Sequence, residues 1–150
     1  MAYLFLVRRM RIAFMAGLAV LLGAASSMHA LPLKPPSAAQ LRELTRPDII
    51  RYRYCGIDYA RALERALRKE PSGLAELFRA TYTCRFDAGA GEAHTAILLG
   101  LLQRWGDRRY AQVLRAQPSR VRRAVMGEIA SALDEPERRQ FPETYSLAPH

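Results

Sequence analysis

AHTAILLGLLQRW (93–105) is the stretch of the chain that decides its fold class. Large apolar residues fall on nearly every side of a helix drawn through it: Ile97, Leu98, Leu99, Leu101, Leu102 and Trp105. Such a helix is buried on most sides, so other elements must pack around it. Gly106 supplies a C-terminal stop, and Asp107 is a suitable N-cap for a following helix. The stretch therefore predicts a buried helix inside a helical domain.

Apolar residues at helical spacing, together with residues that favour helix caps, extend this pattern in both directions. They predict further helices over 37–44, 58–69, 72–82, 107–116 and 120–133. The segment 49–54 (IIRYRY) alternates from Ile50 like a strand, but no second strand candidate exists to pair with it. We therefore interpret it as a short helix that ends at Gly56.

These segments predict an all-α fold, either a small irregular helical bundle or a short HEAT-like helical stack of about five or six helices. Short Gly-Asp and Pro-Ser turns are typical of helical repeats, but the segments share no clean period. Residues 31–36 (LPLKPP) contain three prolines and predict an extended linker. Residues 37–150 are expected to form one domain, with an irregular C-terminal tail after Pro136 that lies against the body.

Residues 1–30 have the layout of a secretory signal peptide that is cleaved on export. An arginine-rich start precedes the apolar run 12–22, and small residues follow that run. The run is well short of the roughly 20 residues that span a bilayer, so we expect no transmembrane segment in the mature chain. Met10 is an alternative start, and cleavage is expected after one of three residues: Ala25, Ser27 or Ala30. The mature chain is then periplasmic or secreted.

Cys55 and Cys84 are the only cysteines in the chain. In an oxidising compartment an even pair predicts one disulfide. The pair lacks C-x-x-C spacing and a nearby histidine, so a metal or redox site is the weaker interpretation. Cys55 precedes the 58–69 helix and Cys84 follows the 72–82 helix. A bridge between them therefore predicts an antiparallel helical hairpin.

The formal net charge of +9 falls by three when the signal peptide leaves, so the mature surface is still cationic. Export argues against nucleic acid as the partner, whereas an acidic protein or an anionic envelope polymer is available to an exported chain. A solvated, arginine-rich surface without a specific partner is the alternative interpretation of the same charge.

Glu92 and His94 lie at the glycine-rich entry to the apolar helix and are the candidate catalytic residues. They could cooperate only if the helix began later, with Thr95 as its cap, because positions two apart on a helix diverge. In the alternative interpretation Glu92 complements the helix dipole and His94 packs near the hairpin. The chain has no metal-ligand cluster and no nucleophile motif, so we expect no metal and no cofactor.

Three tyrosines interleave with three arginines near the front of the domain and are candidate partner-binding residues: Arg51, Tyr52, Arg53, Tyr54, Tyr59 and Arg61. An Arg–Tyr surface can bind an acidic or glycan partner through charge and stacking. In the alternative interpretation the tyrosines are half-buried under arginine stems.

The sequence thus predicts an exported, non-enzymatic interaction or binding module of unknown partner, such as an inhibitor, an immunity-type factor or an envelope adaptor. One alternative is a small envelope hydrolase or transferase that uses His94 with Glu92. Another is a weak binder of anionic envelope polymer or lipid headgroups.

Overall fold

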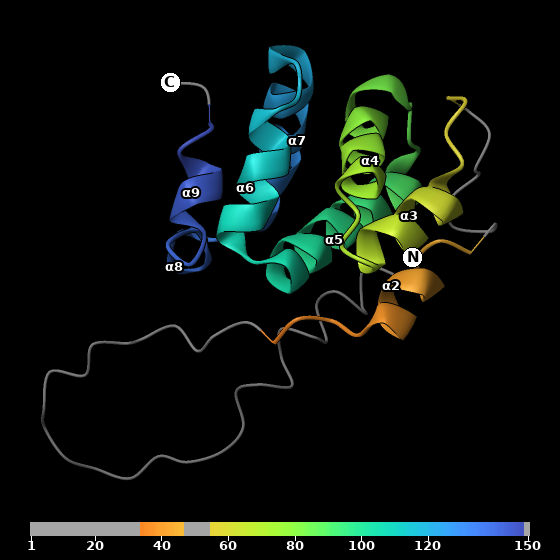
Figure 1. The fold of residues 1–150 in the computed structure, drawn as a ribbon, viewed down its shortest axis with the longest axis horizontal. Helices are drawn as coiled ribbons and strands as arrows, with labels where there is room; N and C mark the ends of the chain where they lie inside the picture. The colour runs from red at the N-terminus through yellow and green to blue at the C-terminus, as the bar shows by residue number, and fades with distance from the viewer. Residues whose placement is uncertain (1–33, 47–54, 149–150) are drawn as a thin grey trace, which may run out of the picture.

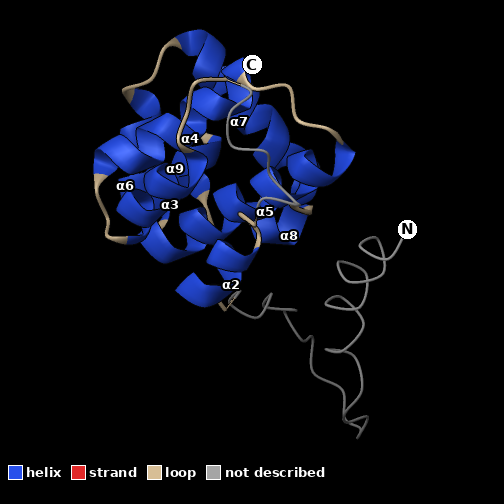
Figure 2. Ribbon diagram, turned by 90° about the vertical axis from the view of Figure 1, so that its right-hand side faces the viewer, coloured by secondary structure: helices blue, strands red, loops and turns tan. Residues whose placement is uncertain are grey.

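The computed structural model describes residues 34–46 and 55–148, and these ranges contain helices and no strand. The helices are α2 (Ala38–Glu43), α3 (Tyr59–Leu67), α4 (Pro71–Thr83), α5 (Ala88–Trp105), α6 (Asp107–Arg115), α7 (Ser119–Ala132), α8 (Glu135–Arg138) and α9 (Pro142–Tyr145). The predicted all-α class is therefore confirmed (Figure 2). The predicted signal peptide and the 49–54 segment lie outside the described residues.

The helix α6 packs against α9 and α4, and α4 also packs against α7, while α5 runs beneath α6 and α7 and contacts both (Figure 1). The sequence explains the position of α5, because its large apolar side chains face neighbours on most sides. Ile97, Leu98, Leu101 and Leu102 are fully buried. None of the helices in the described ranges has both the length and the apolar character that a membrane span needs.

In the N-terminal half of the domain, α3 and α4 form an antiparallel hairpin. Asp58 caps α3 by accepting a hydrogen bond from the backbone N–H of Arg61 at 3.1 Å. The two helices lie close together at Gly73, where an added Cβ would lie 2.5–2.6 Å from backbone and Cβ atoms of α3. An ion pair of 2.6 Å between Arg65 and Glu76 also joins them. The glycine therefore sets the spacing of the hairpin.

A disulfide between Cys55 and Cys84 closes the open end of this hairpin, with the two Cα atoms 5.2 Å apart. Cys55 precedes α3, and Cys84 is the C-cap of α4. The bridge and the antiparallel hairpin that it predicts are therefore both present in the structure.

The helix α5 begins at Ala88, five residues before the start that the apolar pattern predicts. Asp87 caps the earlier turn by accepting a hydrogen bond from the backbone N–H of Ala90 at 2.9 Å. Ala90 and Ala93 are buried in that turn, which offsets the low helix propensity of the glycines beside them. The glycine-rich entry to the apolar helix, residues 89–94 (GAGEAH), is therefore helical and not a loop.

Asp107 has a different role from the predicted one. It is the first residue of α6 and makes no side-chain cap there. Its carboxylate instead accepts hydrogen bonds from the backbone N–H groups of Glu143 and Thr144, at 2.6 and 2.8 Å. These two amides belong to the first turn of α9, where backbone N–H groups have no partner within the helix. Asp107 therefore caps a helix that lies far along the chain.

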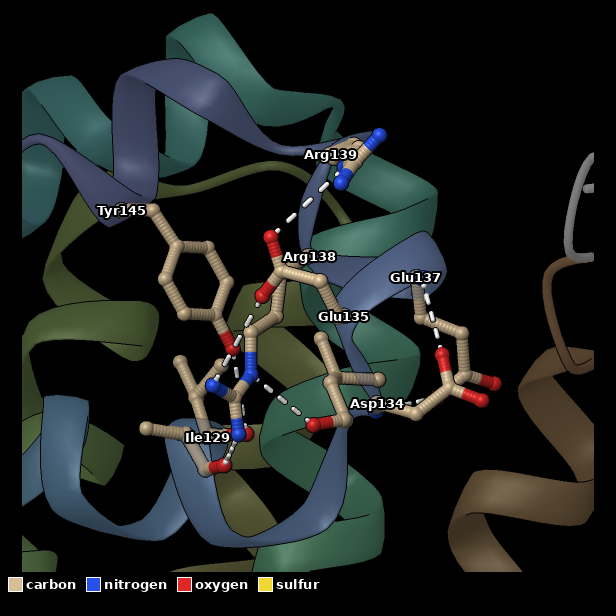
Figure 3. A network of polar contacts seen from close by, with 9 residues as sticks. Ile129, Asp134, Glu135, Glu137, Arg138, Arg139 and Tyr145 are labelled. Carbon is tan, nitrogen blue, oxygen red and sulfur yellow. Dashed lines mark hydrogen bonds and ion pairs between the residues drawn. The ribbon is translucent and has the colours of Figure 1, made fainter.

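The C-terminal tail is not irregular, because it forms the short helices α8 and α9. Arg138 donates hydrogen bonds to the carbonyls of Ala130 and Leu133, at 2.6 and 3.0 Å, and so caps the end of α7 (Figure 3). The hydroxyl of Tyr145 donates to the carbonyl of Ile129 at 3.3 Å. Polar groups on the tail thus bond to backbone carbonyls in the last turn of α7, and these contacts hold the tail against that helix.

Candidate functional site

His94 lies on the second turn of α5, and only 1% of its surface is exposed. The hydroxyl of Tyr59, from α3, is 2.6 Å from its Nδ1 atom. The hydroxyl of Thr81, from α4, is 2.8 Å from its Nε2 atom. The ring therefore joins three helices through both of its nitrogens.

The hydrogen bonds around the ring identify its tautomer. The hydroxyl of Thr81 also donates to the backbone carbonyl of Leu77 at 3.3 Å, so its oxygen accepts a hydrogen bond from Nε2–H. Nδ1 is then the acceptor, and Tyr59 donates to it. This arrangement gives both ring nitrogens and both hydroxyl groups of the network a partner, and it requires a neutral imidazole.

The surroundings of His94 favour the same neutral form. The ring of Phe86 stacks on the imidazole with 4.6 Å between centroids, and Tyr59 packs against both rings edge-on. Burial lowers the pKa of His94 to about 3, and burial raises the pKa of Tyr59 above its ordinary value. At neutral pH the ring is an uncharged structural link with no free nitrogen for a substrate.

Glu92 is exposed and does not meet His94. Both residues lie within α5, so their side chains diverge by about 200° around the helix. Thr95 is not a cap, because it lies inside α5 and donates to the carboxylate of Glu128 on α7 at 2.6 Å. An acid–base pair of Glu92 and His94 would need a helix that begins after Thr95. Because α5 begins at Ala88, that alternative is wrong.

The predicted Arg–Tyr surface is not assembled in the part of the chain that the structure describes. Tyr59 is 2% exposed, and its ring contributes to the core, so its prediction as a surface contact is wrong. Arg61 is exposed on α3. The other four residues lie outside the described ranges: Arg51, Tyr52, Arg53 and Tyr54.

The structure shows a depression between α4, α5 and α6 that sequence reasoning missed. Its volume is about 530 Å³, and Trp105 lines it together with residues of α4 and α6. Lys69 also lines the depression, and its backbone has a left-handed φ of 65°. Its Nζ atom lies 5.7 Å from the centroid of the Trp105 ring. A lysine immediately after the helix end, where glycine is the usual residue, was the one available sequence signal.

Within residues 34–46 and 55–148, no three histidine, cysteine or acidic side chains gather in a way that could hold a metal ion. The fold and the two sites define a small, disulfide-tied helical domain with a buried structural histidine. No known protein family, curated protein or solved structure matches this chain.

Two buried tyrosines provide a matched test of the His94 network. Tyr59→Phe should lower the free energy of unfolding by about 1–3 kcal/mol, because Nδ1 of His94 loses its donor. Tyr110→Phe should leave stability within about 0.5 kcal/mol or raise it, because the Tyr110 hydroxyl is buried with no hydrogen-bond partner among the described residues. Urea denaturation of both variants measures the difference. Equal losses would show that the hydroxyl on His94 has no special role.

The neutral state of His94 also predicts a pH dependence of stability. Its folded pKa, about 3, lies below the unfolded value near 6.5, so the unfolded chain binds the extra proton. The contribution of His94 to the free energy of unfolding is complete above about pH 6.5. It is lost as the pH falls towards 3, by at most ~1.4 kcal/mol per pH unit. Between about pH 7 and pH 5 the loss should be ~2 kcal/mol, measured by urea denaturation. A His94→Gln variant should lose much less over that interval, whereas an equal loss would assign the effect to other groups.

Proposed function

We propose that this chain is an exported binding module that recognises an anionic partner. The observation that carries this proposal is a set of exposed arginines on α6 and the first turns of α7, which we call the α6–α7 arginine surface. The members of this surface are Arg108, Arg109, Arg115, Arg120 and Arg123. None of them forms an ion pair with a described acidic residue.

Most acidic side chains have other roles. Asp58, Asp87 and Asp134 cap helices, and Asp107 caps α9. Further carboxylates pair with arginines elsewhere on the domain, including the Arg42–Glu64 pair at 2.6 Å. The positive charge of the α6–α7 arginine surface is therefore not compensated locally, which favours encounter with an anionic partner.

Tyr82 adds an aromatic contact at the edge of this surface. It is 50% exposed and is the only large hydrophobic residue so exposed in the described part of the chain. The guanidinium of Arg120 lies 5.2 Å from its ring centroid. Arginine and tyrosine are enriched among the residues that dominate binding at protein interfaces. This feature supports a protein partner, and an anionic envelope polymer is the second candidate.

Export of the chain is part of the proposal. The disulfide supports it, because such bridges form and persist in oxidising compartments. The arginine-rich and apolar pattern of residues 1–30 supports it from the sequence. We do not propose the hydrolase or transferase alternative, because His94 is buried with both nitrogens bonded and Glu92 points away from it.

The test compares two variants with the same loss of charge. The first replaces Arg108, Arg115, Arg120 and Arg123 with glutamine, and the control replaces four ion-paired arginines: Arg42, Arg46, Arg68 and Arg139. Binding of fluorescent polyglutamate and of dextran sulfate is measured by anisotropy at low and high salt.

We expect the first variant to bind polyglutamate about tenfold more weakly and the control to change by less than about threefold. Salt should weaken binding of the unmodified chain, because exposed charges are screened. Tighter binding of dextran sulfate would favour the polymer over the protein as the partner. Equal losses in the two variants would contradict a defined surface and leave only the effect of net charge.

A further inference from the structure

The depression between α4, α5 and α6 has a mostly apolar wall. Ala75 lines it from α4, Trp105 from the end of α5, Val113 from α6 and Ala116 from the C-cap of α6. The indole N–H of Trp105 donates to the backbone carbonyl of Ala66 at 2.9 Å, which fixes the ring. The volume, about 530 Å³, falls within the range of small-molecule pockets. An apolar chain placed here would remove this wall from water.

The edge of the depression is positively charged. Lys69 and Arg109 are the charged residues that line it, and no acidic side chain of the described residues does so. Arg109 has no hydrogen bond or ion pair with a described side chain, and the Lys69 ammonium contacts the backbone carbonyl of Arg104. The N-terminus of α4, the positive end of its helix dipole, also lines the depression through Pro71 and Ser72.

Lys69 adopts a backbone conformation that favours glycine, with φ at 65°. Its backbone completes the turn after α3, where Lys69 N–H bonds to Ala66 and Glu70 N–H bonds to Arg65, both at 3.0 Å. A lysine in such a position places its charge at the depression at the cost of local strain. Residues held in rare backbone conformations are concentrated at ligand sites.

We infer that this depression binds a small single-chain amphiphile with an anionic head group. The apolar chain lies against Ala75, Val113 and Ala116, and the head group lies at Lys69 and Arg109. Arg109 belongs to both this site and the α6–α7 arginine surface, whereas the apolar wall and Lys69 belong to the depression alone. The inference can therefore fail or hold separately from the proposed function, because the four-arginine variant that tests that surface leaves Arg109 unchanged.

The test is a ¹H–¹⁵N NMR titration of the disulfide-bonded chain with decanoate, decyl phosphate and decanol, all below their aggregation limits. We expect decanoate or decyl phosphate to shift the signals of the Trp105 indole and of Ala75 and Ala116. The anion that binds more tightly identifies the head group as carboxylate or phosphate. Decanol should bind at least about tenfold more weakly, because it lacks the charge that Lys69 and Arg109 would meet.

Neighbouring arginines supply a matched control. Arg109→Gln should weaken decanoate binding about five- to tenfold, whereas Arg108→Gln should change it by less than about twofold, since Arg108 does not line the depression. Ala116→Phe should abolish binding by filling the space, while a dispersed spectrum reports that the fold is intact. If Ala116→Phe unfolds the chain, the two arginine variants decide the question. The inference is wrong if decanol binds as tightly as decanoate, or if the two arginine variants lose equal affinity.

Discussion

Loss of the Cys55–Cys84 disulfide should lower the free energy of unfolding by about 3–4 kcal/mol, the largest effect that we expect from a local change. The bridge closes a loop with a sequence separation of 29, so it removes many conformations from the unfolded chain. For a domain of this size the melting temperature should fall by about 10 °C or more. Thermal unfolding followed by circular dichroism, with and without reductant, measures the change.

A double Cys55→Ser, Cys84→Ser variant controls for other effects of the reductant. It should melt near the temperature of the reduced chain and should be unaffected by reductant. Mass spectrometry after thiol alkylation verifies that the starting protein holds no free thiol. A melting temperature that shifts by less than about 2 °C on reduction would show that the bridge adds nothing to the packing of the hairpin.

The second large effect is expected at Gly73. A Cβ at this position would lie 2.5 Å from the backbone nitrogen of Ala66 and 2.6 Å from the backbone oxygen of Ala62. Backbone atoms cannot move aside as the end of a side chain can, so α3 and α4 must separate. Gly73→Ala should therefore destabilise the domain by about 3 kcal/mol, at the upper end of overpacking effects. Urea denaturation at neutral pH gives the value.

Gly127 is the matched control for this substitution. It lies inside α7, and a Cβ there would meet nothing within 4 Å. Gly127→Ala should therefore stabilise the domain by about 0.5–1 kcal/mol through helix propensity alone. The same chemical change thus has opposite signs at the two positions. Stabilisation by Gly73→Ala would contradict the close approach of the hairpin helices.

Features that depend on contacts within a few residues could be predicted from the sequence. Ser37 and Asp58 each accept a hydrogen bond from the backbone three residues later, so their caps are local. Gly106 ends α5 with a φ of 79°, as its residue type favours. The apolar pattern of residues 93–105 likewise identifies the most buried helix.

Features that depend on distant contacts could not be predicted in the same way. Asp107 precedes a helix and is a natural cap for it, but its carboxylate binds amides 36 and 37 residues later. Prolines in the tail predict irregular structure, but two short helices form there. A local capping box between Asp134 and Glu137 begins α8, and contacts with the end of α7 hold the tail in place. Tertiary packing decides the bonds of Asp107 and the position of the tail, whereas the start of α8 is local.

The candidate site also combines features that depend on local contacts with features that depend on distant ones. In the sequence, His94 is an imidazole near the start of an apolar helix, a pattern that fits packing better than catalysis. The decisive facts are its burial and its bonds to Tyr59 and Thr81, which come from two other helices. For Lys69 the sequence offers only a weak signal, a lysine where glycine often follows a helix, and its left-handed φ of 65° comes from the structure alone.

The chain is proposed to act by binding and not by catalysis, and the state of His94 tests this most directly. A long-range ¹H–¹⁵N correlation spectrum of the imidazole, recorded between about pH 8 and pH 4, reports both tautomer and protonation, with His94→Gln used for assignment. We expect a neutral ring protonated at Nε2, with no titration down to about pH 4. A ring that titrates with a midpoint near 6.5, or that carries its proton on Nδ1, would contradict the buried structural role and return His94 to the candidates for catalysis.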